Sequence, residues 1–320
     1  MRGAAFFHPR TRPLVAVVAC LLLAGSPSAA PVVGAGSVRA QAGSRPQTKS
    51  QAKPPAARLA AAKAAVPVPA KVSNPRRRTI VIDAGHGGRD RGMTGVTSSQ
   101  RRIYEKDIAL DVARRVARRI ETAGVNVVMT RTTDTLIALH DRGRIANKQQ
   151  GDLFISLHVN AANPKWRQSG GARGFETYFL AEARTEDERR VAQMENEVVQ
   201  FDTEAERPTD GALSFMFNDM VQNEHLRESS ELAATIQARL RGAHPGPNRG
   251  VKQAGFLVLV RAFMPAVLVE IGFGTNRAEA DWMASTAGQA ELAEAIAAAA
   301  LDYLARYERR VSGGSAGGSK

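Results

Sequence analysis

The sequence predicts an α/β domain: a mainly parallel, twisted sheet of about six strands flanked by helices, with a helical insertion before the fifth strand. Two observations support this fold class. Short apolar runs rich in Val and Ile alternate along the chain with longer segments whose apolar residues recur at helical spacing. The chain is 43% hydrophobic and 23% charged, which excludes a disordered chain and favours a soluble domain with a substantial core.

The predicted elements follow in order along the chain. Buried strands are predicted over residues 79–82, 125–129, 153–157, 175–180, 256–260 and 266–269. Helices are predicted over residues 105–120, 138–148, 231–240 and 290–307. The first helix shows the pattern clearly, because apolar residues recur every fourth position from Ile108 to Ile120.

Residues 182–249 lie between the fourth and fifth predicted strands and are much longer than an ordinary connection. This insertion predicts a charged helix over 186–201, a break over 206–211 and helical structure within 213–240 that packs on the sheet. A cluster of Phe and Met residues, Phe215, Met216, Phe217 and Met220, falls in that last part.

Residues 1–42 are typical of an export signal, which predicts a periplasmic protein. Three arginines within the first 12 residues precede an apolar run over 14–24, and small residues follow with candidate cleavage after Ala30, Ala40 or Ala42. The run has about half the roughly 20 residues that a membrane span needs. An uncleaved anchor is the alternative.

The positive charge of the chain is confined to its N-terminal part. The whole chain has 44 Lys+Arg and 31 Asp+Glu; since residues 1–78 contain 13 of the basic residues and none of the acidic ones, the remainder carries 31 of each. An Ala/Pro/Lys-rich linker is predicted over 43–77, a globular domain over 78–308 and a flexible tail over 309–320. The linker is expected to act as a tether, or alternatively to attract an anionic envelope polymer. A nucleic-acid partner is not expected, because the domain itself is electrically balanced.

Two histidines follow predicted strands of the sheet. His86 lies in the glycine-rich segment Asp83–Gly88, and His158 ends the strand that begins at residue 153. The glycine pattern is not that of a dinucleotide site, since a third glycine would be needed where Asp90 stands. Taken singly, His86 is explained as a structural or solvent-facing histidine, and His158 equally well as a ligand or as a buried, hydrogen-bonded imidazole.

Two glutamates complete the set of candidate chemical groups. Glu105 begins the first predicted helix, where a carboxylate also complements the helix dipole. Glu270 ends a strongly apolar strand, where a carboxylate is costly unless it is paired or used. Glu270 is therefore either half of a buried ion pair or a base with a raised pKa.

Together these four residues suggest metal-assisted hydrolysis. Two His and one Glu are a ligand set of catalytic zinc, with a fourth position left for water, and a further carboxylate would move the proton. The single cysteine excludes a thiolate zinc site, and the short HExxH pattern is absent.

Four motifs in this order resemble the zinc-dependent N-acetylmuramoyl-L-alanine amidases of the bacterial cell-separation type. They are TIVIDAGHGG at 79–88, YEKD at 104–107, ISLHVNA at 155–161 and PAVLVEIGF at 265–273 followed by Asn276. The resemblance extends from about residue 78 to 307. It implies that His86, Glu105 and His158 ligate Zn²⁺ and that Glu270 is catalytic. It also implies hydrolysis of the amide between the MurNAc lactyl group and the L-Ala of the stem peptide, for cell-wall remodelling and daughter-cell separation.

The resemblance also bears on the insertion. Regulated members of the family carry an inserted helix that blocks the zinc with a glutamate. By similarity, Glu195 is the first candidate for that role and Glu197 the second, and an activator protein would displace the helix over 186–206. Family-like residues at Arg131, Asp134, Arg142 and Asn147 are expected to anchor loops and a helix end.

Two other functions stay open from the sequence. The domain could be a non-catalytic wall-binding or scaffolding module, although all four chemical positions are present. It could also be a zinc peptidase that cuts within the stem peptide. A monomer is expected.

Overall fold

The computed structural model describes residues 77–165, 169–201 and 225–315, all within one compact unit, Ala64–Lys320. The predicted export signal, most of the predicted linker and the Phe/Met cluster of the insertion lie outside the described residues. Among the described helices, none combines the length and the apolar character needed to cross a bilayer.

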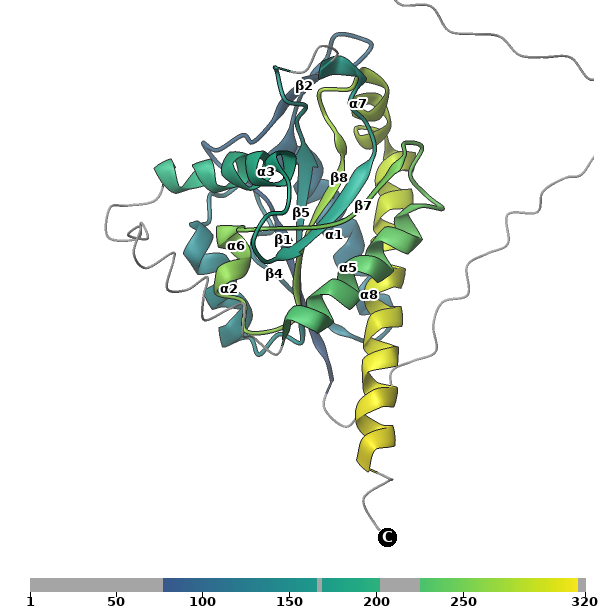
Figure 1. The fold of residues 1–320 in the computed structure, drawn as a ribbon. Helices are drawn as coiled ribbons and strands as arrows, with labels where there is room; N and C mark the ends of the chain where they lie inside the picture. Colours follow the sequence, from purple (N-terminus) through teal and green to yellow (C-terminus); the bar gives the residue numbers. More distant parts are fainter. Residues whose placement is uncertain (1–76, 166–168, 202–224, 316–320) are drawn as a thin grey trace, which may run out of the picture. The chain divides into compact units, whose positions relative to one another are not determined.

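Within the described residues, a mixed sheet of six strands forms the centre of the domain (Figure 1). Its order is β4-β1-β5-β8-β6-β7, and every neighbouring pair is parallel except β8 with β6. The strands are β1 (Thr79–Ala84), β4 (Asn126–Met129), β5 (Leu153–Asn160), β6 (Phe175–Leu180), β7 (Asn248–Ala254) and β8 (Ala266–Phe273). A separate hairpin pairs β2 (Thr94–Val96) with β3 (Arg102–Tyr104). The predicted fold class is confirmed.

Helices cover both faces of the sheet (Figure 1). One face packs against α1 (Glu105–Thr122), α5 (His225–Leu240) and α8 (Thr286–Ser315). The other face carries α2 (Leu139–Lys148), α3 (Glu186–Asn196) and α6 (Leu257–Val260). The described part of the chain also contains α7 (Arg277–Met283) and the short 3-10 turns η1 (Ser169–Gly171) and η2 (Glu197–Phe201).

Alternation along the strands divides the core into two layers. Ile80, Ile82 and Leu157 belong to the cluster under α1 and α8, whereas Val81 and Leu268 belong to the cluster under α2 and α6. Successive strand side chains point to opposite faces. His158 lies four residues after Phe154, and Glu270 lies two residues after Leu268. Because Phe154 and Leu268 both belong to the second cluster, His158 and Glu270 lie on the face that carries α3.

Two sequence predictions were wrong in this region. Residues 256–260 were predicted as a strand, but Leu257–Val260 forms the short helix α6. The backbone N–H of Leu257 donates to the side-chain carbonyl of Asn196, whose amide donates to the carbonyl of Gly255, so this turn is tied to α3 rather than to a strand. The fifth sheet strand is instead β7, which begins within the predicted insertion.

The predicted helices are confirmed, and most of them extend beyond the predicted residues. The helix predicted over 186–201 is α3 followed by η2. Helix α3 begins with a capping box between Thr185 and Glu188. Helix α8 runs on to Ser315, into the segment predicted as a flexible tail.

Candidate metal centre

A glycine-rich loop after β1 presents His86. The backbone N–H of Gly85 still pairs with the carbonyl of Leu157 at 3.0 Å, and the chain then turns through three consecutive residues with positive φ. These are His86 at 58°, Gly87 at 129° and Gly88 at 60°. The two glycines take up this backbone region without penalty, whereas His86 is held there by its surroundings.

Two buried arginines hold this loop by its carbonyl oxygens, as the sequence led us to expect for Arg131 and Arg142. Arg131 donates to the carbonyls of Ala84 and Gly85, and Arg142 donates to those of Ala84 and His86. Arg142 also pairs with the buried carboxylate of Asp83 at 2.9 Å. Burial would raise the pKa of Asp83, but Arg142 outweighs it with help from hydroxyl donors, so that the pKa lies below its ordinary value. The loop thus rests on an ionised internal network.

Asp134 and Asn147 also anchor neighbouring segments. The carboxylate of Asp134 accepts hydrogen bonds from the N–H of Gly88 at 2.7 Å and from Lys106 at 2.6 Å. The side chain of Asn147 bonds to the backbone of Arg261 and Phe263, in the connection before β8.

Glu105, the first residue of α1, is fixed by backbone donors on two sides. Its carboxylate accepts hydrogen bonds from the N–H of Met93 at 2.7 Å and from that of Val159 at 2.8 Å. Its Oε1 lies 3.1 Å from Nε2 of His86 and 3.0 Å from Nδ1 of His158. The helix start, the β2–β3 region and the end of β5 therefore place one carboxylate between two imidazoles.

His158, on β5, packs directly against Gly85. A Cβ atom at position 85 would lie 2.5 Å from the imidazole Cε1, so only glycine leaves room for the ring. The rings of His86 and His158 meet edge to face, with centroids 4.9 Å apart.

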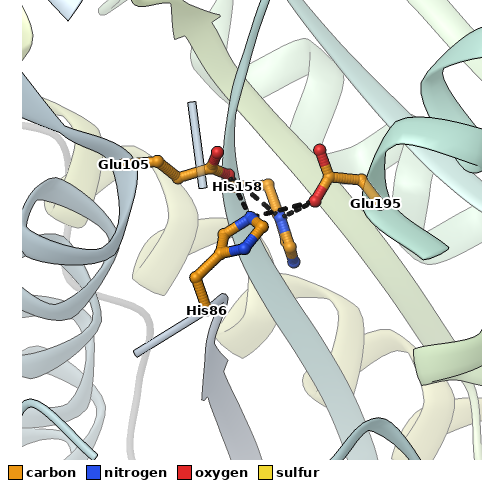
Figure 2. A group of neighbouring side chains, drawn as sticks. All are labelled: His86, Glu105, His158 and Glu195. Carbon is orange, nitrogen blue, oxygen red and sulfur yellow. Dashed lines mark hydrogen bonds and ion pairs between the residues drawn. The ribbon is translucent and has the colours of Figure 1, made fainter. Parts of the chain in front are cut away.

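Glu195, near the end of α3, approaches the same point from the opposite side (Figure 2). Its Oε2 lies 2.6 Å from Nδ1 of His158 and 3.0 Å from Nε2 of His86. One ligand-type atom from each of His86, Glu105, His158 and Glu195 lies within 4.8 Å of all the others, and all four residues are buried. Glu197, the second candidate of the insertion, is exposed in η2.

These contacts are close, yet several do not have hydrogen-bond geometry. Among the described residues, Nε2 of His86 and both carboxylate oxygens of Glu195 have no hydrogen-bond partner. Donors around zinc each lie about 2 Å from the ion, and hence roughly 3.3 Å from one another. Buried donor atoms that face a common point at such separations are the arrangement of a metal ligand set.

Asp90 is a site residue that the sequence argument missed. Its carboxylate lies 2.7 Å from Nδ1 of His86, which places the proton of a neutral imidazole on Nδ1 and leaves the Nε2 lone pair facing the cluster. The sequence contained a signal for this role, a carboxylate four residues after a histidine in a tight loop, but position 90 was considered only as a missing glycine.

The electrostatics of the cluster fit a cation at its centre. Burial would lower the pKa of His158, but Glu195 and Glu105 raise it to about 9. Burial would also lower the pKa of His86, but Glu105 and Glu195 together raise it well above its ordinary value. The two carboxylates thus favour positive charge between them, which a divalent ion would supply.

Glu270 lies beside the cluster and outside it. It is the register partner of His158 on the adjacent parallel strand β8, and it is fully buried. Among the described residues, neither of its carboxylate oxygens has a hydrogen-bond partner. Burial, followed by repulsion from Glu195 and Glu105, raises the pKa of Glu270 well above its ordinary value. Of the two sequence interpretations, the buried ion pair is not observed among the described residues.

Comparison with known proteins identifies the family. Residues 80–302 match the family Amidase_3, described as N-acetylmuramoyl-L-alanine amidase. The amidase AmiA of Salmonella typhimurium is 31% identical over 73% of this chain and 78% of its own length. An N-acetylmuramoyl-L-alanine amidase from Clostridium difficile 630 superposes with a TM-score of 0.52 at 30% identity, covering 71% of this chain and 97% of that one. The amidase AmiC2 of Nostoc punctiforme superposes with a TM-score of 0.51 at 28% identity, covering 71% and 97%. The chain therefore belongs to the N-acetylmuramoyl-L-alanine amidase family.

Proposed function

We propose that this amidase uses a zinc ion, held by His86, Glu105 and His158, to hydrolyse the amide between the MurNAc lactyl group and the L-Ala of the stem peptide. The observation that carries the proposal is the convergence of three sequence-distant donors on one buried point, next to Glu270, which has no hydrogen-bond partner among the described residues. Nε2 of His86, Nδ1 of His158 and Oε1 of Glu105 are the donor atoms. When bound, zinc would lower the pKa of water and polarise the scissile carbonyl.

Glu270 is proposed as the group that moves the proton. It accepts a proton from the attacking water as the new C–O bond forms, and delivers it to the L-Ala nitrogen as the C–N bond breaks. Its raised pKa and its place beside His158 support this role, since a carboxyl group with a raised pKa accepts a proton more readily than an ordinary one. Asp90 keeps His86 in the ligand tautomer.

Glu195 is proposed to close the site. A catalytic zinc keeps its fourth position open, and the Glu195 carboxylate stands at a fourth corner of the donor set. Helix α3 would then exclude substrate until an activator protein displaces the segment 186–206, which begins with this helix. A differential binding free energy of a few kcal/mol would be enough to shift such an equilibrium.

The cellular role is proposed from the family. The signal at residues 1–42 would export the enzyme to the periplasm, where it would act on peptidoglycan during daughter-cell separation. Periplasmic location is testable by fractionating cells and probing for the mature chain.

Mass spectrometry of digested peptidoglycan tests the reaction. The zinc-loaded protein is expected to release stem peptides with a free L-Ala N-terminus. These products should be absent from digests made with the chelated protein or with the Glu270→Gln variant. Fragments cut within the stem would identify a peptidase instead, and intact sacculi bound by the protein would identify a binding module.

A matched pair of variants tests the closed state. Glu195→Gln is expected to raise hydrolysis of purified sacculi, whereas Glu197→Gln, an exposed glutamate two residues away, should leave it unchanged. Equal activity of the wild type and Glu195→Gln would exclude inhibition through this carboxylate.

A further inference from the structure

Two cations on β7 share one oxygen of a buried carboxylate near the metal centre. Nε of Arg249 lies 2.7 Å and Nζ of Lys252 lies 2.5 Å from Oε2 of Glu176, on the neighbouring strand β6. Glu176 is fully buried, and its other oxygen accepts hydrogen bonds from Asn160 and Tyr178. Both cations are partly accessible, with 25% and 16% of their side-chain surfaces exposed.

The carboxylate that binds this pair, Glu176, lies in line with the catalytic groups. His158 on β5 is the register partner of Glu270 on β8, and Glu270 is the register partner of Glu176 on β6. The row of His158, Glu270 and Glu176 therefore crosses three neighbouring strands, and the next strand, β7, carries Arg249 and Lys252. Since β6 runs antiparallel to β8, its first residues lie at the edge of the sheet where β5 and β8 end.

A carboxylate from α3 already sits against the two cations. Oδ2 of Asp187 is 3.4 Å from Arg249 and 3.6 Å from Lys252, and Asp187 also pairs with Arg190 of its own helix at 3.3 Å. Charge-assisted hydrogen bonds measure about 2.7–2.9 Å, so this carboxylate is loosely held. It belongs to the same helix as Glu195, eight residues earlier, and 1.5 Å of rise per residue separates the two along the axis by about 12 Å.

If α3 moved away, Arg249 and Lys252 would lose one of their carboxylate partners. Among the described residues, Glu176 and Asp187 are the carboxylates paired with the two cations. Without Asp187, the pair would hold one excess positive charge and unused N–H donors, because guanidinium and ammonium groups offer five and three. One cation would suffice to neutralise Glu176, whereas two oriented cations suit a second carboxylate.

We propose that Arg249 and Lys252 form a carboxylate-binding subsite for an acidic stem peptide, and that Asp187 occupies it while α3 is closed. The inference rests on the proposed amidase function and adds to it a determinant of substrate recognition. An extended peptide advances about 3.3 Å per residue, so a span of about 12 Å corresponds to three to four residues beyond the cleaved amide. The two cations bind substrate and take no part in bond cleavage.

Paired substrates test the subsite. The probes are two N-acetylmuramoyl-L-Ala peptides, one with free carboxylates on the residues after L-Ala and one with those carboxylates amidated. Each is assayed with the full zinc-loaded chain, with and without Glu195→Gln. In the Glu195→Gln background, which opens the site, the enzyme should prefer the acidic probe, and Lys252→Met should lower kcat/KM for it roughly tenfold, through KM, with the amidated probe unaffected. Lys252→Arg should restore the preference, and Lys148→Met, at an exposed lysine of α2, should preserve it.

A second measurement needs no variant in this subsite. The free acidic peptide, added as a competitive inhibitor, should inhibit the wild-type chain or Glu195→Gln at lower concentration than its amidated form, and the difference should shrink in high salt. Equal kcat/KM for the two probes, or an unchanged preference in folded Lys252→Met, would overturn the subsite while the amidase function stands. Failure of the Glu195→Gln protein to cleave either probe, with metal bound, would instead overturn the proposed function.

Discussion

Gly85→Ala is the substitution for which the structure supplies the sharpest prediction. A Cβ atom at position 85 would lie 2.5, 2.6 and 2.9 Å from three atoms of the His158 ring. Gly85 does not adopt positive φ, so alanine meets no backbone strain there. The loop cannot retreat, because its N–H is bonded to Leu157 and its carbonyl to Arg131. The imidazole must move instead.

The size of that movement sets the expected loss. Ordinary contact begins at 3.4 Å, so relieving a 2.5 Å approach requires a shift of about 0.9 Å. Ligand distances in a metal site tolerate about ±0.2 Å. We therefore expect zinc affinity to fall at least tenfold and kcat/KM to fall about 100-fold. Overpacking should lower the free energy of unfolding by about 1–3 kcal/mol, a few degrees in Tm.

The assay combines zinc competition with a chromophoric chelator, muropeptide hydrolysis and thermal unfolding. Gly170→Ala is the matched control, since a Cβ atom there meets nothing within 4 Å. Wild-type zinc affinity in a folded Gly85→Ala protein would refute the assignment of His158 as a ligand.

Two further predictions concern the groups around the donors. Asp90→Asn should weaken zinc binding about 10–100-fold in the chelator assay with little change in Tm, because it removes the charge that orients His86; unchanged affinity would contradict this role. Asp83→Asn should lower the free energy of unfolding by roughly 3 kcal/mol at pH 7, because it leaves Arg142 buried without its counter-charge. Since the folded-state pKa of Asp83 lies below its ordinary value of about 4, this contribution is present above pH 4 and is lost as pH falls through the folded pKa. The difference in the free energy of unfolding between the wild type and Asp83→Asn, measured in urea, should therefore be smaller at pH 3 than at pH 7 or 5. A difference that stays constant down to pH 3 would show that Asp83 is not the titrating group.

Most of the fold and four of the site positions could be predicted from local patterns. His158 and Glu270 stand out because each is a polar group that follows a mainly apolar run, which is typical of a buried strand. Strands that run parallel end at one edge of the sheet, so their terminal side chains converge. Glu195 could be named only by family resemblance, since a glutamate in a charged helix carries no local signal.

Other features depend on contacts between segments that are distant in the sequence. Strand β7, with the sequence NRGVKQA, has no continuous apolar run, and it becomes a strand through pairing with β6. The apolar run at 256–260 suits a strand or a helix, and the hydrogen bonds of Asn196 to Gly255 and Leu257 accompany the helical outcome.

The sequence by itself determined the family, the layered architecture and the residues able to hold a metal, because those properties lie in periodicity and in motifs at strand ends. The tertiary structure alone decided that Glu195 meets the two histidines while Glu197 is exposed, that Asp90 orients His86, and that Arg249 and Lys252 pair with Glu176, the register partner of Glu270. The physical reason is that register and helix docking bring these groups together across long stretches of chain, and side-chain spacing along one strand or helix does not encode which partner lies opposite.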